Sequence, residues 1–135
     1  MASDEARQAF LAEPQLGVLS TVGRDGGPHA VPIWYLYEDG VIRISVSEGS
    51  QKHRNVERDP RVALAVDRRE RPYYALTALG AATIEPSFGD EERLRLATRY
   101  LGEAAAQEYL KNRGPGGSVT IQFRPDRFFE FESPV

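Results

Sequence analysis

A segment of alternating apolar and polar residues, Val41–Ser47, precedes a predicted helix, Gln51–Arg58. The alternation has the period of a β-strand, so one face is apolar and the other carries Arg43, Ser45 and Ser47. Ser50 is a good N-cap, and the N–H groups at a helix N-terminus bind phosphate. Lys52 adds a positive charge in the first turn, where the helix dipole disfavours it unless an anion is bound. From these residues alone, a phosphate site at Lys52 and an ordinary capped surface helix are equally supported.

A second segment that could contribute to a binding site is Val31–Tyr35. Pro32 has no N–H for a strand ladder, so it belongs at a sheet edge or a bulge. A bulge beside a groove leaves neighbouring backbone groups free to meet a ligand. Trp34 is the only tryptophan. It is either a stacking wall for a ligand ring or an interface or core residue, and the core is the ordinary place for a lone aromatic in a strand.

The side chains that serve acid–base or nucleophilic catalysis form no recognisable set. The chain has no cysteine and two histidines. We interpret His29 as a strand-start residue and His53 as a solvent-facing helix residue. The sequence therefore predicts no catalytic side chain and no metal site, which fits a reaction carried by a bound cofactor.

The composition is that of a globular protein. The chain has 135 residues, of which 41% are hydrophobic and 27% charged, and we expect one domain over residues 1–135. A net charge of −3 argues against nucleic-acid binding. No apolar run reaches the roughly 20 residues that span a bilayer, and the acidic N-terminus does not resemble a signal peptide. We therefore expect a cytoplasmic protein that does not enter a membrane.

Turn signals divide the chain into short strands with few helices. Helices are predicted at Asp4–Leu11, Gln51–Arg58 and Asp90–Arg113, the last broken near Gly102 and followed by a loop, Gly114–Gly117. Strands are predicted at Leu16–Val22, His29–Tyr37, Val41–Ser47, Arg61–Asp67, Tyr73–Glu85, Ser118–Arg124 and Arg127–Glu132. Six or seven strands connected mostly as hairpins predict a mainly β (α+β) fold, an antiparallel β-barrel with short flanking helices.

Two stretches resemble the pyridoxamine 5′-phosphate oxidase-like split-barrel superfamily. The first lies within 16–35 and comprises LGVLSTV, DGGPH and VPIWY, and the second is GSQKHRNVERDPRV at 49–62. The second is more specific, because it joins a strand, a helix and the following strand at fixed spacing. The resemblance extends over residues 6–132 and is closest to the flavin/deazaflavin oxidoreductases that include coenzyme F420-binding reductases. It implies an FMN-binding split-barrel fold and strengthens the phosphate interpretation of Lys52.

The resemblance also implies roles for individual residues. The cofactor phosphate is expected to bind to Ser47, Ser50, Gln51 and Lys52. The tricyclic ring is expected to contact Val31, Pro32 and Ile33, with Ser45 and Val46 beneath the ribityl chain. In this family two sites form across a homodimer interface, so Tyr73 and Tyr74, or 127–129, are expected to complete the partner's site. Large aromatic residues on the predicted strands favour a homodimer independently; they are Trp34, Tyr35, Tyr73, Tyr74, Phe128 and Phe129.

The sequence departs from the true oxidases at two points. Gln51 stands where they have an arginine before the phosphate lysine, and their C-terminal arginine–histidine pattern is missing. These departures argue against vitamin B6 oxidation and favour a reductase that passes a hydride from coenzyme F420 to a small apolar or conjugated substrate. The alternative is an FMN-dependent oxidoreductase, or a non-catalytic module that binds FMN, haem or another tetrapyrrole.

The preference for coenzyme F420 over FMN depends on cations beyond the phosphate site. The F420 tail is rich in carboxylates, and Arg54 and Arg58 lie four residues apart on one predicted helix face, with Arg61 following. These arginines are predicted to follow the tail. The competing interpretation is that they pair with surface acids such as Glu57 and Asp59 and contribute little.

Overall fold

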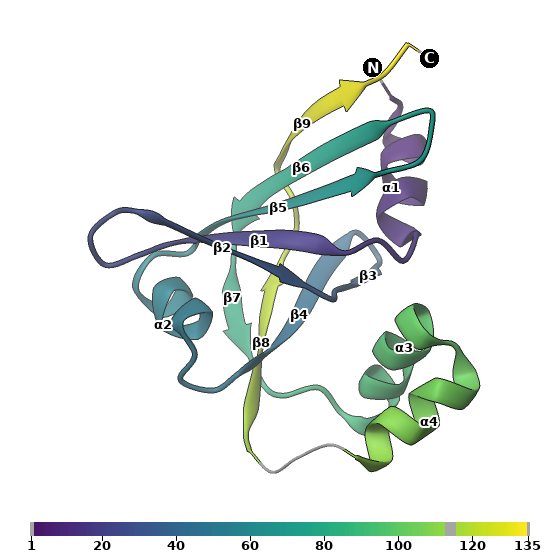
Figure 1. Ribbon diagram of the computed structural model, residues 1–135. Coiled ribbons are helices and arrows are strands. Elements are labelled where there is room, and N and C mark those ends of the chain that lie inside the picture. The colour runs from purple at the N-terminus through teal and green to yellow at the C-terminus, as the bar shows by residue number, and fades with distance from the viewer. Residues whose placement is uncertain (1, 113–115, 135) are drawn as a thin grey trace.

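The computed structural model describes residues 2–112 and 116–134, which form four helices and nine β-strands. The helices are α1 (Asp4–Ala12), α2 (Gln51–Arg58), α3 (Asp90–Leu101) and α4 (Glu103–Lys111). The strands are β1 (Gly17–Val22), β2 (Pro28–Ile33), β3 (Leu36–Glu38), β4 (Val41–Ser47), β5 (Arg61–Arg68), β6 (Tyr74–Ala81), β7 (Thr83–Glu85), β8 (Ser118–Phe123) and β9 (Arg127–Glu132). They make two antiparallel sheets, in the orders β2-β1-β5-β6-β9 and β3-β4-β8-β7 (Figure 1).

Two predicted strands are each broken in two, which raises the strand count above the predicted six or seven. The prediction of one strand over His29–Tyr37 is wrong, because β2 lies in the five-stranded sheet and β3 in the four-stranded sheet. Tyr73–Glu85 divides in the same way into β6 and β7. At the breaks the backbone N–H groups leave the ladder: Tyr35 donates to the Tyr100 hydroxyl at 3.1 Å and Ala82 to the Pro60 carbonyl at 2.8 Å. These breaks are the corners at which the chain passes between the sheets.

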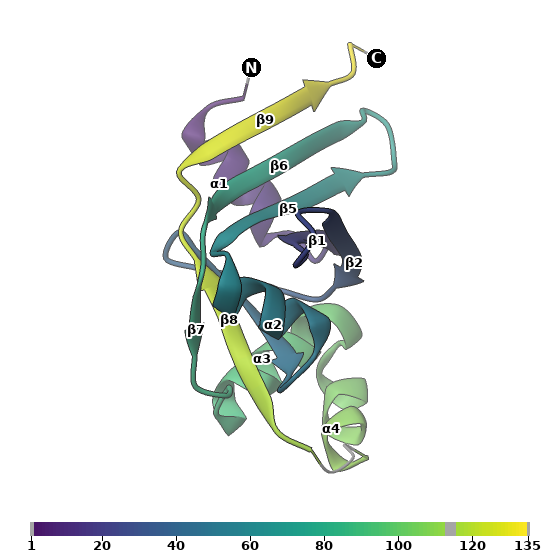
Figure 2. The same ribbon diagram turned by 90° about the vertical axis from the view of Figure 1, so that its left-hand side faces the viewer.

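The core lies between the inner faces of the two sheets. The five-stranded sheet contributes Leu19, Leu64 and Leu76, and the four-stranded sheet contributes Ile42, Ile44 and Ile121, all of them buried. The predicted alternation of 41–47 is confirmed, since Ile42, Ile44 and Val46 are buried whereas Arg43, Ser45 and Ser47 are not. Helix α1 lies against this same face of the five-stranded sheet, behind β5, β6 and β9 in Figure 2.

The four helices begin close to where the sequence predicts. Helix α2 has the predicted bounds, with Ser50 as its N-cap, and α1 extends one residue further than predicted, to Ala12. The predicted break divides 90–113 into α3 and α4 at Gly102, whose φ of +82° suits glycine. Arg113, the last residue of that predicted helix, and the first two residues of the predicted loop 114–117 lie outside the described residues. No described helix is long and apolar enough to cross a membrane.

Candidate functional site

A cavity of about 390 Å³ lies between the four-stranded sheet, the end of β2 and the α3–α4 pair. One side of it carries hydroxyl groups from neighbouring strands, Ser45 and Ser47 on β4 and Ser118 on β8. The other side is mainly apolar and aromatic, formed by Ile33, Trp34, Phe88, Leu96, Tyr109 and Leu110. The arrangement suits a ligand with a hydroxyl-rich or polar part and a flat apolar part.

Trp34 stands at the cavity as part of an aromatic stack. Its ring is nearly parallel to that of Tyr100, with centroids 4.9 Å apart and planes at 9°, and the Tyr109 ring is tilted against it at 5.5 Å. The Tyr100 hydroxyl accepts from the backbone N–H of Tyr35 and donates to the Gln15 carbonyl at 2.9 Å. Because Tyr100 is fixed in this way, it holds Trp34 as a wall of the cavity.

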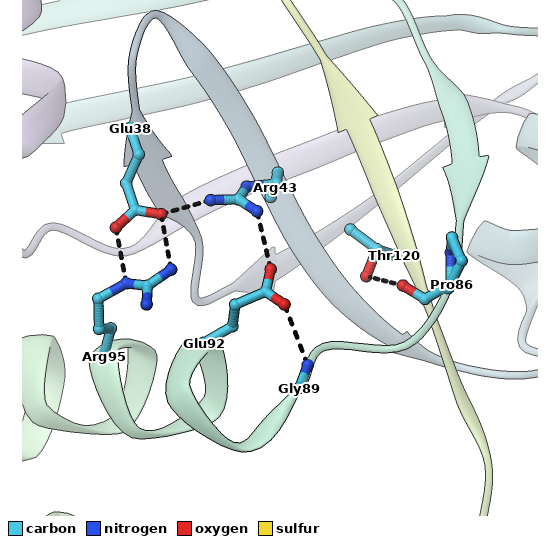
Figure 3. Close-up of polar contacts among 7 residues, drawn as sticks. All are labelled: Glu38, Arg43, Pro86, Gly89, Glu92, Arg95 and Thr120. Carbon is cyan, nitrogen blue, oxygen red and sulfur yellow. Dashed lines mark hydrogen bonds and ion pairs between the residues drawn. The ribbon is translucent and has the colours of Figure 1, made fainter.

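An ion-pair network attaches α3 to the sheet beside this cavity (Figure 3). Arg95 on α3 donates to Glu38 at 2.8 Å, and Arg43 on β4 donates to Glu92 at 2.7 Å and also to Glu38. The hydrogen bond from Arg95 lowers the pKa of Glu38, against the opposing effect of burial, and Arg43 lowers it further. The Arg43 guanidinium is therefore occupied with α3 and is not a free donor on the ligand face of β4.

The segment that leads into α3 has its own anchors. The Thr120 hydroxyl donates to the Pro86 carbonyl at 2.8 Å, and the backbone N–H of Gly89 donates to Glu92 at 3.0 Å (Figure 3). Arg93 lines the cavity and donates to the Ser87 hydroxyl at 2.7 Å. The helical wall of the cavity is thus held by polar contacts at several points.

The turn before α2 is closed by a histidine. The Ser50 side chain accepts from the backbone N–H of His53 at 3.4 Å, as an N-cap does. The His53 ring accepts at Nδ1 from the backbone N–H of Gly49 at 2.9 Å, and the residue is only 9% exposed. The interpretation of His53 as solvent-facing is therefore wrong, because the ring turns inward to satisfy the Gly49 N–H. His29 lies near the start of β2, as expected.

A buried amide network joins α2 to β1. Asn55 is fully buried and donates to the Thr21 hydroxyl at 2.9 Å, while its Oδ1 atom accepts from the Gln51 amide at 2.7 Å. Sequence reasoning missed Asn55; the available signal was its spacing of four residues from Gln51 on the same helix face. The side chain of Gln51 is consequently engaged within the helix.

The predicted ring residues divide between two faces of β2. Val31 and Ile33 pair with Leu19 and Gly17 on the inner face, and Ile33 lines the cavity. Pro32 pairs with Val18 and is exposed on the opposite face. Its side chain is therefore separated from those of its two neighbours.

The remaining predicted residues also divide. Ser45 and Ser47 line the cavity, whereas Val46 is buried in the core. Ser50, Gln51, Lys52 and Arg54 follow on α2 and its cap, and they do not line this cavity. Lys52 is half-buried and Arg54 exposed, and neither side chain has a hydrogen bond or ion pair within the described part of the chain.

Arg58 at the end of α2 and Arg61 at the start of β5, both predicted to follow the F420 tail, have partners within the chain. Arg58 donates to the Val22 carbonyl at 2.7 Å, and Arg61 pairs with Asp59 at 2.7 Å. The competing interpretation holds for Arg61, whose hydrogen bonds lower the pKa of Asp59 to about 2. Of the three predicted tail-binding arginines, only Arg54 has no contact of this kind with another described residue.

Comparison with known proteins gives one family and several similar structures. The model of the family described as pyridoxamine 5′-phosphate oxidase matches residues 3–131. A conserved hypothetical protein from Mycobacterium tuberculosis has 24% identity and a TM-score of 0.75, over 98% of this chain and 86% of that chain. An F420 reductase has 27% identity and a TM-score of 0.73, over 90% of this chain and 94% of that chain. A heme binding protein from Mycobacterium smegmatis has 23% identity and a TM-score of 0.68, over 99% of this chain and 56% of that chain. The first and third likenesses, below 25% identity, establish the split-barrel fold alone.

Proposed function

This chain belongs to the pyridoxamine 5′-phosphate oxidase family, and on that premise we propose that it is an oxidoreductase that uses coenzyme F420 to reduce a small apolar or conjugated substrate. The observation that carries the proposal is the cavity whose lining includes Ile33, Ser45 and Ser47, three residues that the family resemblance assigns to the cofactor. The likeness to an F420 reductase supports the choice of cofactor.

Donors in the cavity, and on α2 after the Glu48–Ser50 turn that follows Ser47, fit such a cofactor by their chemistry. Ser45, Ser47 and Ser118 offer hydroxyl groups to a ribityl chain. The Lys52 ammonium and the backbone N–H groups of Gln51 and Lys52, for which the described residues supply no partner, offer donors to a phosphate. When bound, a deazaflavin supplies hydride transfer.

The protein's own residues would orient the substrate and limit the access of water. Trp34 and Tyr109 provide a flat aromatic surface, and Phe88 and Leu96 extend it with apolar groups. The contacts of Arg43 with Glu38 and Glu92 keep α3 in place over this surface. An apolar conjugated substrate gains most from such a wall, because its binding removes apolar area from water.

FMN is the competing cofactor, and tail recognition separates the two. Since Arg58 and Arg61 bind within the chain, Arg54 is the cation left to meet the carboxylates of an F420 tail. For a haem module, both ring nitrogens of His53 already face protein groups, which leaves His29 as the histidine that would have to bind the iron. Vitamin B6 oxidation is less well supported, since Gln51 replaces the expected arginine and its amide binds Asn55.

A second copy of this chain covers the outer face of the five-stranded sheet in the proposed assembly. The face carries small side chains at its centre, among them Ala63, Ala65 and Thr77. Phe129 and Phe131 on β9 are 56% and 60% exposed at its edge. Of the aromatics that predict a homodimer from sequence, Tyr35 and Tyr74 are instead buried in the core. The exposed aromatic residues that support a homodimer at this face are therefore those of β9. Apolar faces of this kind are typical of homodimer interfaces.

Calorimetric titration with coenzyme F420 and with FMN tests the proposed function. The chain has two lysines, so Lys111→Ala is a matched control for Lys52→Ala. We expect Lys52→Ala to weaken cofactor binding about tenfold to a hundredfold, the loss of one charge-assisted contact, while Lys111→Ala leaves it unchanged. Equal binding by both variants would refute the phosphate assignment. Haem uptake with a Soret band, and no binding of either flavin, would replace the proposal with a tetrapyrrole-binding module.

A further inference from the structure

The ring of His53 faces a protein group at each nitrogen. Nδ1 accepts from the backbone N–H of Gly49 at 2.9 Å, and Nε2 lies 3.5 Å from a Glu57 carboxylate oxygen. A ring nitrogen that accepts an N–H carries no proton, so the proton of this imidazole is on Nε2 and points toward Glu57. The Gly49 hydrogen bond therefore exists only with the neutral ring.

This hydrogen bond completes the turn through which the chain enters α2. Gly49 has a φ of +81°, which glycine adopts without steric cost. On either side of it, the N–H groups of Glu48 and Ser50 donate to the carbonyls of Gly117 and Ser47, both at 3.1 Å. All three N–H groups of the turn are thus taken by protein acceptors. The first N–H groups left for a ligand are those of Gln51 and Lys52.

We propose that His53 is a positioning residue for the cofactor phosphate, because its neutral ring holds the Glu48–Ser50 turn in the shape that directs the N–H groups of Gln51 and Lys52 outward. The inference rests on the proposed cofactor site at α2. Protonation of His53 places a hydrogen on Nδ1 opposite the Gly49 N–H and breaks the bond. The turn then loses one of its three fixed points, and phosphate affinity falls.

The charged groups near the ring determine the sign of this effect. On α2 the other charged side chains are Lys52, Arg54, Glu57 and Arg58. Of the strands packed against α2, β1 and β8 have no ionisable side chain, β4 has Arg43, which is paired with α3, and β7 has Glu85, which accepts from Thr83. A protonated His53 pairs with Glu57 through Nε2. Its charge is largely offset there, so the loss of the Gly49 bond dominates.

Two substitutions distinguish the effect of the hydrogen-bond acceptor from the effect of the ring shape. In His53→Asn the side-chain oxygen sits as many bonds from the backbone as Nδ1, and it accepts without titrating. His53→Phe keeps the ring shape and removes the acceptor. At pH 7.5 we expect His53→Phe to weaken coenzyme F420 binding about twofold to tenfold, the worth of one hydrogen bond, and His53→Asn to bind as the parent does.

The titration is done with the full chain, with FMN as a second probe, and the Gly49 amide signal is followed by ¹H–¹⁵N NMR. The inference predicts that this signal moves in His53→Phe, which lacks the acceptor, and stays near its parent position in His53→Asn. If His53→Phe binds both cofactors as tightly as the parent, or if His53→Asn binds them as weakly as His53→Phe, His53 does not position the phosphate. If the parent binds neither cofactor, the proposed function fails as well, and a Gly49 signal that still moves in His53→Phe would assign the hydrogen bond a structural role only.

Discussion

The contacts of Arg43 make the attachment of α3 open to a direct test by the substitution Arg43→Met. Arg43 joins Glu38 on β3 to Glu92 on α3, and the three side chains are 24%, 30% and 28% exposed. A buried charge-assisted hydrogen bond contributes about 1.5–3 kcal/mol, whereas an exposed ion pair contributes about 0.2–1 kcal/mol. For two partly buried contacts, with the stem of the side chain kept by methionine, we expect a loss of about 1–3 kcal/mol.

The assay is urea denaturation followed by Trp34 fluorescence, because Trp34 stacks on Tyr100 of α3 and reports the attachment of that helix. Arg61→Met is the matched control, since within the described residues the Arg61 side chain pairs only with Asp59, two residues away, and is 76% exposed. We expect the control to leave the midpoint unchanged. The lowered pKa of Glu38 adds a pH test. The ionised Glu38 contributes to stability above the ordinary glutamate range, and this contribution is lost as pH falls through its lowered folded pKa. The midpoints of the parent and of Arg43→Met should therefore converge in acid. Equal midpoints for Arg43→Met and Arg61→Met at pH 7 would refute this account of how α3 is held.

Three further perturbations test other parts of the structure. Glu130→Gln removes a buried carboxylate that accepts from Arg7, Tyr74 and the backbone N–H of Ala2, and we expect it to lower the unfolding free energy by about 3 kcal/mol at pH 7. Burial raises the pKa of Glu130, but these hydrogen bonds outweigh it and the pKa is lowered overall. The difference in unfolding free energy between the parent and Glu130→Gln should therefore shrink as pH falls through this lowered pKa, and equal stability of the two proteins at pH 7 would show that the cluster is unimportant. Asn55→Ala leaves the Thr21 hydroxyl and the Gln51 amide without their buried partner, and we expect it to lower the unfolding free energy, measured by urea denaturation, by about 2–4 kcal/mol. A loss below about 0.5 kcal/mol would show that α2 is held by other contacts. Ala65→Arg, at the centre of the outer face of the five-stranded sheet, should convert the proposed dimer to a folded monomer in light scattering, and an unchanged dimer would mean that this face is not the interface.

Much of the fold follows from local signals in the sequence. The period-two alternation of 41–47 and the Ser50 cap define β4 and α2 to the residue, because both signals act within a few positions. The corners at Trp34–Tyr35 and Ala82 were missed, since nothing local distinguishes a strand that changes sheets from one that continues. Their backbone N–H groups bind Tyr100 and Pro60, partners far away in sequence. Long-range acceptors of this kind leave no periodic trace.

The same distinction applies to the candidate site. Ile33, Ser45 and Ser47 were named from sequence and line the cavity, because their strand and face follow from alternation and family resemblance. The contributions of α3 and α4 were not foreseen, since the packing of a helix over a sheet depends on pairs such as Arg43 with Glu92. The orientation of His53 was misjudged for a related reason. A polar residue on a charged helix looks solvent-facing until a backbone donor, here Gly49, is found to need it.

The central claim, that a deazaflavin binds in the cavity beside Trp34, is tested most directly by the fluorescence of that single tryptophan. The account predicts saturable quenching of Trp34 by coenzyme F420, with one equivalent bound per chain and a weaker affinity for a tail-less analogue at low salt. Trp34→Phe provides the background signal. Binding of coenzyme F420 that leaves Trp34 emission unchanged would contradict the account, as would tight quenching by FMN beside weak quenching by coenzyme F420.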